Sequence, residues 1–259
     1  MKSFHKMEHK NMNENKKLKR QSYFVTEAIK MIEANGVGHL TARAVAEASG
    51  FNPASIYNYF ENMDHLENLA SIYFTDNYVK DLSRATRTVL TGLESYMIMW
   101  EIFLVHALNN PDLYYNVFYS AISQSGKHNL FKEYYTIFPE QRITGSYLSE
   151  MMEIDVIQNR GLYVLGLCAK EGSVDPSMVS YINDIQIGYT KCVMTDIVKS
   201  KLIKPSPAVF HKCIAYIIYS MLMYVPDDKK AYLGQILAFH LKHTEDYSTY
   251  CNAVITSER

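Results

Sequence analysis

Apolar residues recur at helical spacing along most of this chain. In residues 67–87, for example, Leu69, Ile72, Tyr73, Val79 and Leu82 fall on one side of a helix. Breakers of regular structure are few, with 11 glycines and 7 prolines among 259 residues. Because glycine and proline interrupt helices, this pattern predicts an all-α protein.

Start signals divide the pattern into separate helices. A capping residue followed directly by proline, which suits the first position of a helix, occurs at Asn52, Asn110, Asp175 and Ser206. The polar residues 123–129 interrupt the pattern. Helices are expected over about 67–87, 93–108, 130–138, 149–170, 176–201, 206–224 and 227–243, with another beginning at residue 111.

The most informative stretch, residues 41–66, predicts two short helices joined by a tight turn and followed by a third. Thr41 is a candidate N-cap of the first helix, and Asn52 is a candidate N-cap of the second. Gly50 stands where the chain must turn, because glycine tolerates a left-handed backbone. Asp64 and Glu67, three residues apart, resemble a capping box for the third helix. Together these signals predict a helix-turn-helix.

The second helix has an inner and an outer side. Ile56 and Phe60 are spaced to face inward, whereas the remaining positions carry small or hydrogen-bonding side chains. A helix of this kind can enter the major groove of DNA and contact base edges and phosphates. The alternative is an ordinary two-helix corner with no ligand, since such corners are common.

These residues resemble the DNA-binding domain of the TetR-type bacterial transcription regulators. The resemblance covers about residues 18–80 and includes an upstream helix. Two departures affect individual DNA contacts: Met63 replaces a usual lysine, and Phe51-Asn52 replaces a usual valine–serine. The matching positions are Ala28, Ile32, Gly36, Thr41, Val45, Ala46, Ser49, Gly50, Ile56, Tyr57, Tyr59, Phe60 and Leu66.

The resemblance implies double-stranded DNA as a partner. It places Thr41 and Tyr57 near phosphates, and a two-fold dimer would read a near-palindromic operator. The residues expected to face DNA are Thr41, Arg43, Asn52, Ser55, Tyr57, Asn58 and Tyr59.

Charge is distributed unevenly. The net charge is −1, but residues 1–20 hold seven Lys or Arg against two Glu, which gives 7 − 2 = +5 and leaves −6 for the remainder. We therefore expect residues 1–17 to form a flexible basic tail that could lie along DNA phosphates. A solvated tail without a binding role is the alternative.

The domain organisation follows from these signals. We expect the helix-turn-helix domain at residues 18–66, a connecting helix at 67–87 and a larger helical domain at 88–250. In the resembled family, the larger domain dimerises and holds a small-molecule inducer. The helices 176–201 and 206–225 would form the dimer interface, because the second has a broad apolar surface. Ligand binding would shift the population of helix arrangements and release a repressor from its operator.

The inducer is expected to be largely apolar or aromatic. Aromatic residues and methionines are concentrated in residues 96–165, and such side chains line apolar pockets as well as ordinary cores. The candidate contacts are Met97, Trp100, Phe103, Tyr114, Phe118, Tyr147, Met151 and Tyr163.

Other functions have weaker support. No strand–turn–helix elbow or phosphate loop is evident, so we expect neither an enzyme nor a resident cofactor. Two alternatives remain open: an adaptor that has lost operator binding, which Met63 would favour, and a metal or haem sensor using His106, His240 or His243. No apolar run suits a membrane span, and no signal segment is present, so we expect a cytoplasmic protein without membrane contact.

Overall fold

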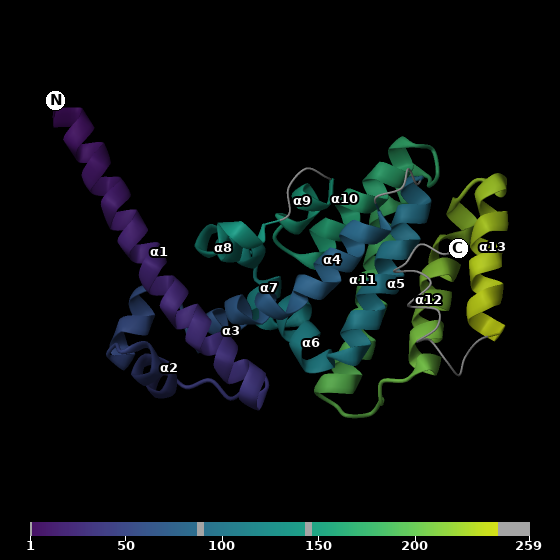
Figure 1. Ribbon diagram of the computed structural model, residues 1–259. Coiled ribbons are helices and arrows are strands. Elements are labelled where there is room, and N and C mark those ends of the chain that lie inside the picture. Colours follow the sequence, from purple (N-terminus) through teal and green to yellow (C-terminus); the bar gives the residue numbers. More distant parts are fainter. Residues whose placement is uncertain (1, 87–90, 143–146, 243–259) are drawn as a thin grey trace. The chain divides into compact units, whose positions relative to one another are not determined.

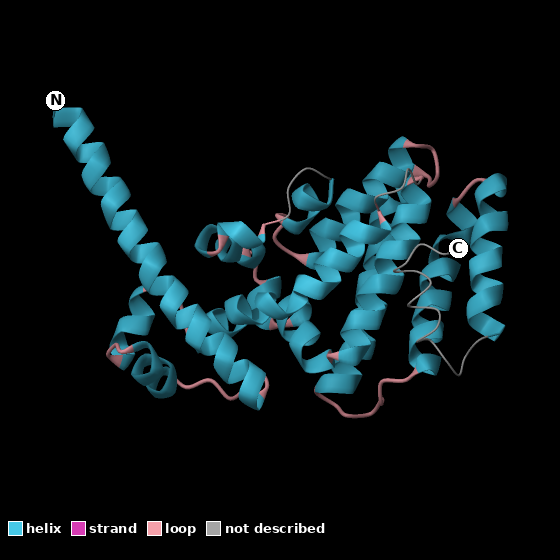
Figure 2. Ribbon diagram, in the orientation of Figure 1, coloured by secondary structure: helices cyan, strands magenta, loops and turns pink. Residues whose placement is uncertain are grey.

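The computed structural model describes residues 2–86, 91–142 and 147–242, and it describes side chains for 12–86, 91–142 and 148–242. Within these ranges the regular structure is entirely helical (Figure 2), which confirms the predicted fold class. None of the described helices is both long and apolar enough to cross a membrane. The α-helices are α1 (Lys2–Asn35), α2 (Ala42–Ser49), α3 (Met63–Ile72), α4 (Asp76–Ala85), α5 (Gly92–Asn109), α6 (Pro111–Tyr119), α7 (Ala121–Gln124), α8 (Leu130–Ile137), α9 (Tyr147–Met152), α10 (Ile157–Lys170), α11 (Val179–Val198), α12 (Pro207–Met221) and α13 (Asp227–Lys242); the 3₁₀ helices are η1 (Pro53–Asn58), η2 (Tyr73–Thr75), η3 (Pro139–Gln141), η4 (Pro176–Met178) and η5 (Leu222–Tyr224).

The described residues form two compact units, and each unit is built from two separate segments of the chain. The first unit takes its residues from Met1–Phe74 and Ser120–Asp155, and the second from Thr75–Tyr119 and Val156–Arg259. The described residues of 120–155 therefore belong to the same unit as the N-terminal helices, although the sequence boundaries assigned them to the larger C-terminal domain.

The first unit is assembled on α1. Helices α2 and α3 pack against α1, and η1 packs against α2 (Figure 1). Phe24 and Ala28 of α1 are completely buried, and Phe24 lies 6.1 Å from Phe60 between ring centroids. Helix α8 covers α3 and α1 and adds the buried Phe131 and Tyr134 to this core. The helix-turn-helix is thus held by residues from two distant parts of the sequence.

The second unit has α5 at its centre, in contact with α4, α6, α10 and α12. Fourteen of the 18 residues of α5 are buried, which is why this helix is apolar on nearly all sides. Three buried polar side chains contact one another: His240 Nε2 lies 3.3 Å from Glu101 Oε1, and His240 Nδ1 lies 2.8 Å from His211 Nδ1. His240 is therefore part of a buried hydrogen-bonded chain, whereas the metal-sensor alternative had treated it as a free ligand.

Two expected long helices are interrupted. The expected connecting helix over 67–87 is divided into α3, η2 and α4. The expected helix over 149–170 is divided into α9 and α10. Between these two helices, Asn129 Nδ2 donates a hydrogen bond to the Glu153 carbonyl at 2.5 Å.

The basic N-terminal segment is helical, so the expectation of a flexible tail over residues 1–17 was wrong. Helix α1 begins at Lys2 and continues without a break to Asn35. Residues 2–35 contain neither glycine nor proline, and each residue added to an existing helix contributes one further hydrogen bond. The half of α1 that packs in the first unit is already helical, and the basic half continues the same helix.

Candidate nucleic-acid interface

The turn between α2 and η1 has the predicted caps. Thr41 Oγ1 accepts a hydrogen bond from the Ala44 N–H at 3.2 Å, and Asn52 Oδ1 accepts one from the Ala54 N–H at 2.9 Å. Gly50 ends α2 with a φ of 74°, a left-handed conformation that favours glycine. These three residues fix the direction in which the chain enters η1.

Helix η1 has one buried side and one exposed side, as its sequence predicts. Ile56 of η1 and Phe60, which follows it, are buried inside the first unit. Tyr57 has 55% of its surface exposed, and Asn52 and Asn58 are also exposed. Because these side chains are not needed for packing, they are available to a partner outside the domain.

The expected DNA-facing residues differ in their surroundings. Arg43 and Thr41 are exposed beside the start of α2, and Ser55 is half-buried. Tyr59 is half-buried, its ring lies 5.8 Å from that of Phe24, and its hydroxyl accepts a hydrogen bond from Arg20. Tyr59 therefore supports the fold of the domain, whereas the other six residues lie on or near its surface.

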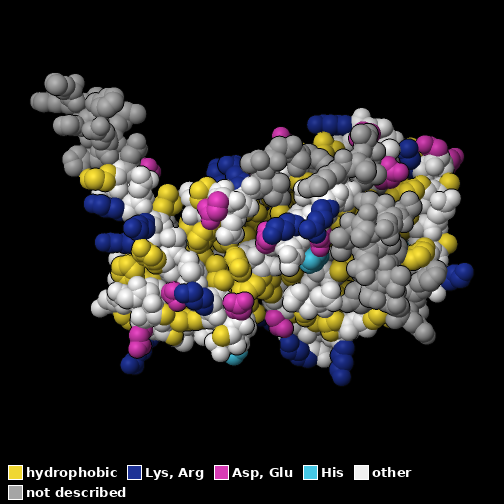
Figure 3. Space-filling view, in the orientation of Figure 1, with side chains coloured by type: hydrophobic (Ala, Val, Ile, Leu, Met, Phe, Trp, Pro, Cys, Tyr) yellow, Lys and Arg dark blue, Asp and Glu magenta, His cyan; other side chains and the backbone are white. Residues whose placement is uncertain are grey.

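A basic stretch of α1 accompanies η1 in the same unit. Lys16, Lys17, Lys19 and Arg20 are all exposed on consecutive turns, and Lys and Arg side chains stand along this part of α1 in Figure 3. Arg20 Nη1 lies 3.1 Å from the Tyr59 hydroxyl at the end of η1. Positive charge is thereby fixed close to the exposed side of η1, where it can attract phosphates.

The third helix begins differently from the prediction. Its N-cap is Asn62, whose Oδ1 accepts a hydrogen bond from the His65 N–H at 2.8 Å, so Asp64 lies inside the helix and not at its cap. Glu67 instead accepts a hydrogen bond from the Gly38 N–H at 2.6 Å. Burial raises the pKa of Glu67, although the Gly38 hydrogen bond opposes this shift. A tertiary contact has replaced the expected capping box.

Part of the expected effector set lies together in the second unit. The rings of Trp100 and Phe103 are 5.9 Å apart, those of Phe103 and Phe118 are 5.2 Å apart, and those of Tyr114 and Phe118 are 5.7 Å apart. Tyr78, which the sequence did not single out, also belongs to this aromatic cluster, with its ring 6.1 Å from that of Tyr114.

The remaining expected effector contacts are dispersed. Met97 is fully buried on α5, and Tyr163 is half-buried on α10. Met151 is buried in the first unit, so it belongs to a different core from the aromatic cluster. The side chain of Tyr147 lies outside the described residues.

The two described histidines of the sensor alternative have different partners. His106 Nε2 lies 2.9 Å from Asp81 Oδ2, within hydrogen-bond distance, and His240 contacts Glu101 and His211. His243 lies outside the described residues. A different group, His65, His128 and Glu133, brings potential metal ligands together, and the sequence did not indicate it.

Comparison with known proteins identifies the helix-turn-helix. Residues 24–68 match the family described as bacterial regulatory proteins, tetR family. No curated protein sequence matches the chain.

Similar solved structures include two of a gamma-butyrolactone receptor (ArpA-like protein). One is 13% identical with a TM-score of 0.43 and covers 86% of this chain and 97% of that chain. The other is 12% identical with a TM-score of 0.44 and covers 88% and 99%. A TetR family transcription regulator from Marinobacter aquaeolei VT8 is 13% identical with a TM-score of 0.40 and covers 81% and 98%.

Proposed function

We propose that this chain, whose residues 24–68 match the tetR family of bacterial regulatory proteins, is a dimeric, DNA-binding, ligand-responsive transcription regulator. The exposed side of η1 beside the basic stretch of α1 is the observation that carries this proposal. In the proposed complex, η1 lies in the major groove of a near-palindromic operator and the basic stretch follows the phosphates. The regulator is a repressor that its effector releases from DNA.

Dimerisation through α11 and α12 is supported by an exposed apolar face. Tyr181 and Ile185 of α11 and Tyr216 and Tyr219 of α12 each expose at least half of their surface. The rings of Tyr189 and Tyr216 stack at 4.6 Å, so the two helices present one continuous face. Large exposed apolar patches mark interaction sites in proteins, and a second copy of the chain would cover this one in an isologous contact.

An effector site in the second unit is supported by the aromatic cluster. Tyr114 is almost completely buried, and its hydroxyl has no hydrogen-bond partner among the described residues. A buried hydroxyl without a partner is unfavourable, and a ligand with one polar group could satisfy it. The cluster therefore favours a largely apolar or aromatic effector with a single hydrogen-bonding group.

Operator binding can be tested by fluorescence anisotropy with DNA from directly upstream of the gene that encodes this chain. Titrations at several salt concentrations would compare this DNA with a scrambled sequence of the same length. We expect tight binding that prefers the upstream DNA at every salt concentration. Equal, weak binding to both DNAs that disappears with salt would contradict the proposal and would favour an adaptor without operator binding.

A matched pair of variants assigns the binding surface. Tyr57→Ala removes an exposed side chain from η1, whereas Tyr73→Ala removes one from η2 in the same unit. We expect Tyr57→Ala to weaken operator binding and to leave the helix content and the dimer intact. Unchanged affinity for Tyr57→Ala, or an equal loss in both variants, would contradict the role of η1.

A further inference from the structure

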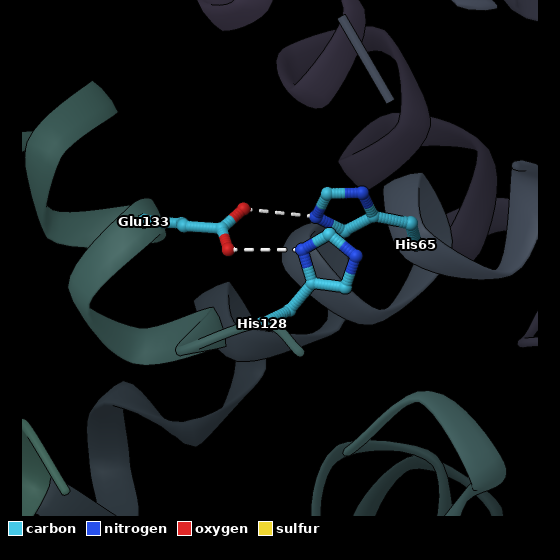
Figure 4. Close-up of side chains that lie close together, drawn as sticks. All are labelled: His65, His128 and Glu133. Carbon is cyan, nitrogen blue, oxygen red and sulfur yellow. Dashed lines mark hydrogen bonds and ion pairs between the residues drawn. The ribbon is translucent and has the colours of Figure 1, made fainter. Parts of the chain in front are cut away.

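A group of potential metal ligands lies in the first unit. It combines His65 of α3, His128 just before α8, and Glu133 of α8 (Figure 4). One ligand atom from each residue lies within 4.8 Å of the other two. His65 is buried, and the other two are half-buried. Because α3 packs against α8, the positions of these ligands are fixed by tertiary structure and not by a flexible loop alone.

The Glu133 carboxylate lies between the two imidazole rings. Its Oε2 is 2.9 Å from His65 Nε2, and its Oε1 is 3.1 Å from His128 Nδ1. In a tetrahedral zinc site with metal–ligand distances of about 2.0–2.2 Å, neighbouring ligand atoms lie roughly 3.3 Å apart. The two distances from the carboxylate to the imidazole nitrogens are thus close to the edge length of such a coordination shell.

His128 has carboxylate oxygens at both of its ring nitrogens. Its Nε2 lies 2.7 Å from Glu61 Oε2, and its Nδ1 faces Glu133. Either an imidazolium with two N–H groups, or a metal ion at Nδ1 with Nε2–H donating to Glu61, satisfies both nitrogens. Zinc uptake distinguishes these two states.

We propose that His65 Nε2, His128 Nδ1 and the Glu133 carboxylate bind a divalent transition-metal ion of the zinc class. Two imidazoles and a carboxylate suit zinc better than magnesium or calcium, which prefer oxygen ligands throughout. Glu61 is a positioning residue that orients His128 by accepting its Nε2–H, as carboxylates commonly do for metal-binding histidines. Three protein ligands leave the fourth position to water or a small anion.

Metal binding alters one contact at the beginning of α3. The Glu61 N–H donates to His65 Nδ1 at 3.2 Å, which places the ring proton of neutral His65 on Nε2. Coordination through Nε2 moves this proton to Nδ1, so the Glu61 contact is exchanged for the metal bond. The His65 ring also packs edge-on against Phe60, with centroids 5.8 Å apart. The ion therefore links His65, near the beginning of α3, to His128 and Glu133, while the Glu61 N–H loses its acceptor.

The proposal is tested on the full chain without an affinity tag, after treatment with a chelator. Zinc titration against a competing chelator gives the affinity, and Co²⁺ substitution gives the visible bands of a tetrahedral site. We expect one ion per chain in the unmodified protein. His128→Gln and Glu133→Gln should weaken zinc binding roughly 100-fold or more, and Glu61→Gln should weaken it roughly 10- to 100-fold.

A control variant and a stability readout complete the test. His39→Gln changes an exposed histidine of the same unit and should bind zinc like the unmodified chain. Zinc should raise the melting temperature of the unmodified chain and of His39→Gln, but not that of Glu133→Gln. Circular dichroism identifies any variant that fails to fold. If either His128→Gln or Glu133→Gln is unfolded, the other variant decides the outcome.

Two results would overturn the proposal. One is no uptake of zinc or cobalt by the unmodified chain; the other is unchanged affinity in the folded His128→Gln or Glu133→Gln variant. No DNA is present in these measurements, so a failure of operator binding would leave the result on the metal site intact.

Discussion

Arg20 of α1 donates a hydrogen bond to the hydroxyl of Tyr59 at the end of η1, although the two residues are 39 positions apart in the sequence. Through this contact the basic stretch of α1 is attached to the helix that we propose to enter the major groove. The extension of α1 is therefore part of the candidate interface, whereas the sequence alone had suggested a separate flexible tail.

Arg20→Ala should reduce the salt dependence of operator binding. If Arg20 lies near one phosphate, its loss should lower the slope of log K against log salt by about one and weaken binding to every sequence. The measurement is a salt series by fluorescence anisotropy. Lys30→Ala is the control, because Lys30 lies on the same helix and pairs with Glu27 at 2.7 Å; equal slopes for the two variants would contradict this role of Arg20.

Asn62→Ala should destabilise the protein more than Asp64→Ala. Loss of the Asn62 cap should lower the free energy of unfolding by about 1 kcal/mol, since the His65 N–H loses its acceptor. Loss of Asp64 removes only a charge near the start of α3, worth roughly 0.3 kcal/mol. Urea unfolding measures both values, and the opposite order would restore Asp64 as the cap.

Ile185→Glu should convert the proposed dimer to a monomer. A charge placed in the exposed face of α11 and α12 would have to be buried without a partner when two copies associate. Light scattering coupled to gel filtration gives the mass directly. Leu241→Glu changes a similarly exposed apolar side chain of α13 and should remain dimeric; a dimeric Ile185→Glu would exclude this face as the interface.

The three described cysteines should differ in their reaction with iodoacetamide. Burial raises the pKa of both the Cys168 and the Cys213 thiols to about 12, whereas Cys192 is exposed on α11. Since the thiolate is the reactive form, the two buried thiols should react slowly at pH 8, and their rates should rise about tenfold per pH unit.

Peptide mapping by mass spectrometry assigns the modified residue. The experiment is done on the monomeric Ile185→Glu variant, where no partner covers Cys192. Rapid modification of Cys168 or Cys213 at pH 8 in folded protein would show that these side chains are not buried as described.

Local signals in the sequence predicted the turn correctly. Thr41, Gly50 and Asn52 have the expected capping roles, because a cap depends on residues only two or three positions away. The inward positions of Ile56 and Phe60 were equally predictable from helical spacing. The match of residues 24–68 to the tetR family confirms the resemblance that these same residues carried.

Contacts between distant residues could not be predicted from local signals. His65 and His128 are 63 positions apart, and His128 lies in a polar stretch that the sequence indicated only as a break between helices. The sequence similarly predicted a local capping box of Asp64 and Glu67. In the structure, the Glu67 carboxylate instead accepts a hydrogen bond from the Gly38 N–H. Only the packing of α8 on α3 brings the metal ligands together, and hydrophobic periodicity contains no information about that pairing.

The chain passes three times between its two units, after Phe74, Tyr119 and Asp155. A shortened chain that ends at residue 74 would lack α7 and α8, which cover α3, and would expose apolar surface to water. The same connectivity restricts how such a protein can diversify by recombination. A single crossover near residue 74 would combine α3 with α7 and α8 from another protein. The helix-turn-helix segment and the segment 120–155 that packs on it must therefore be inherited together.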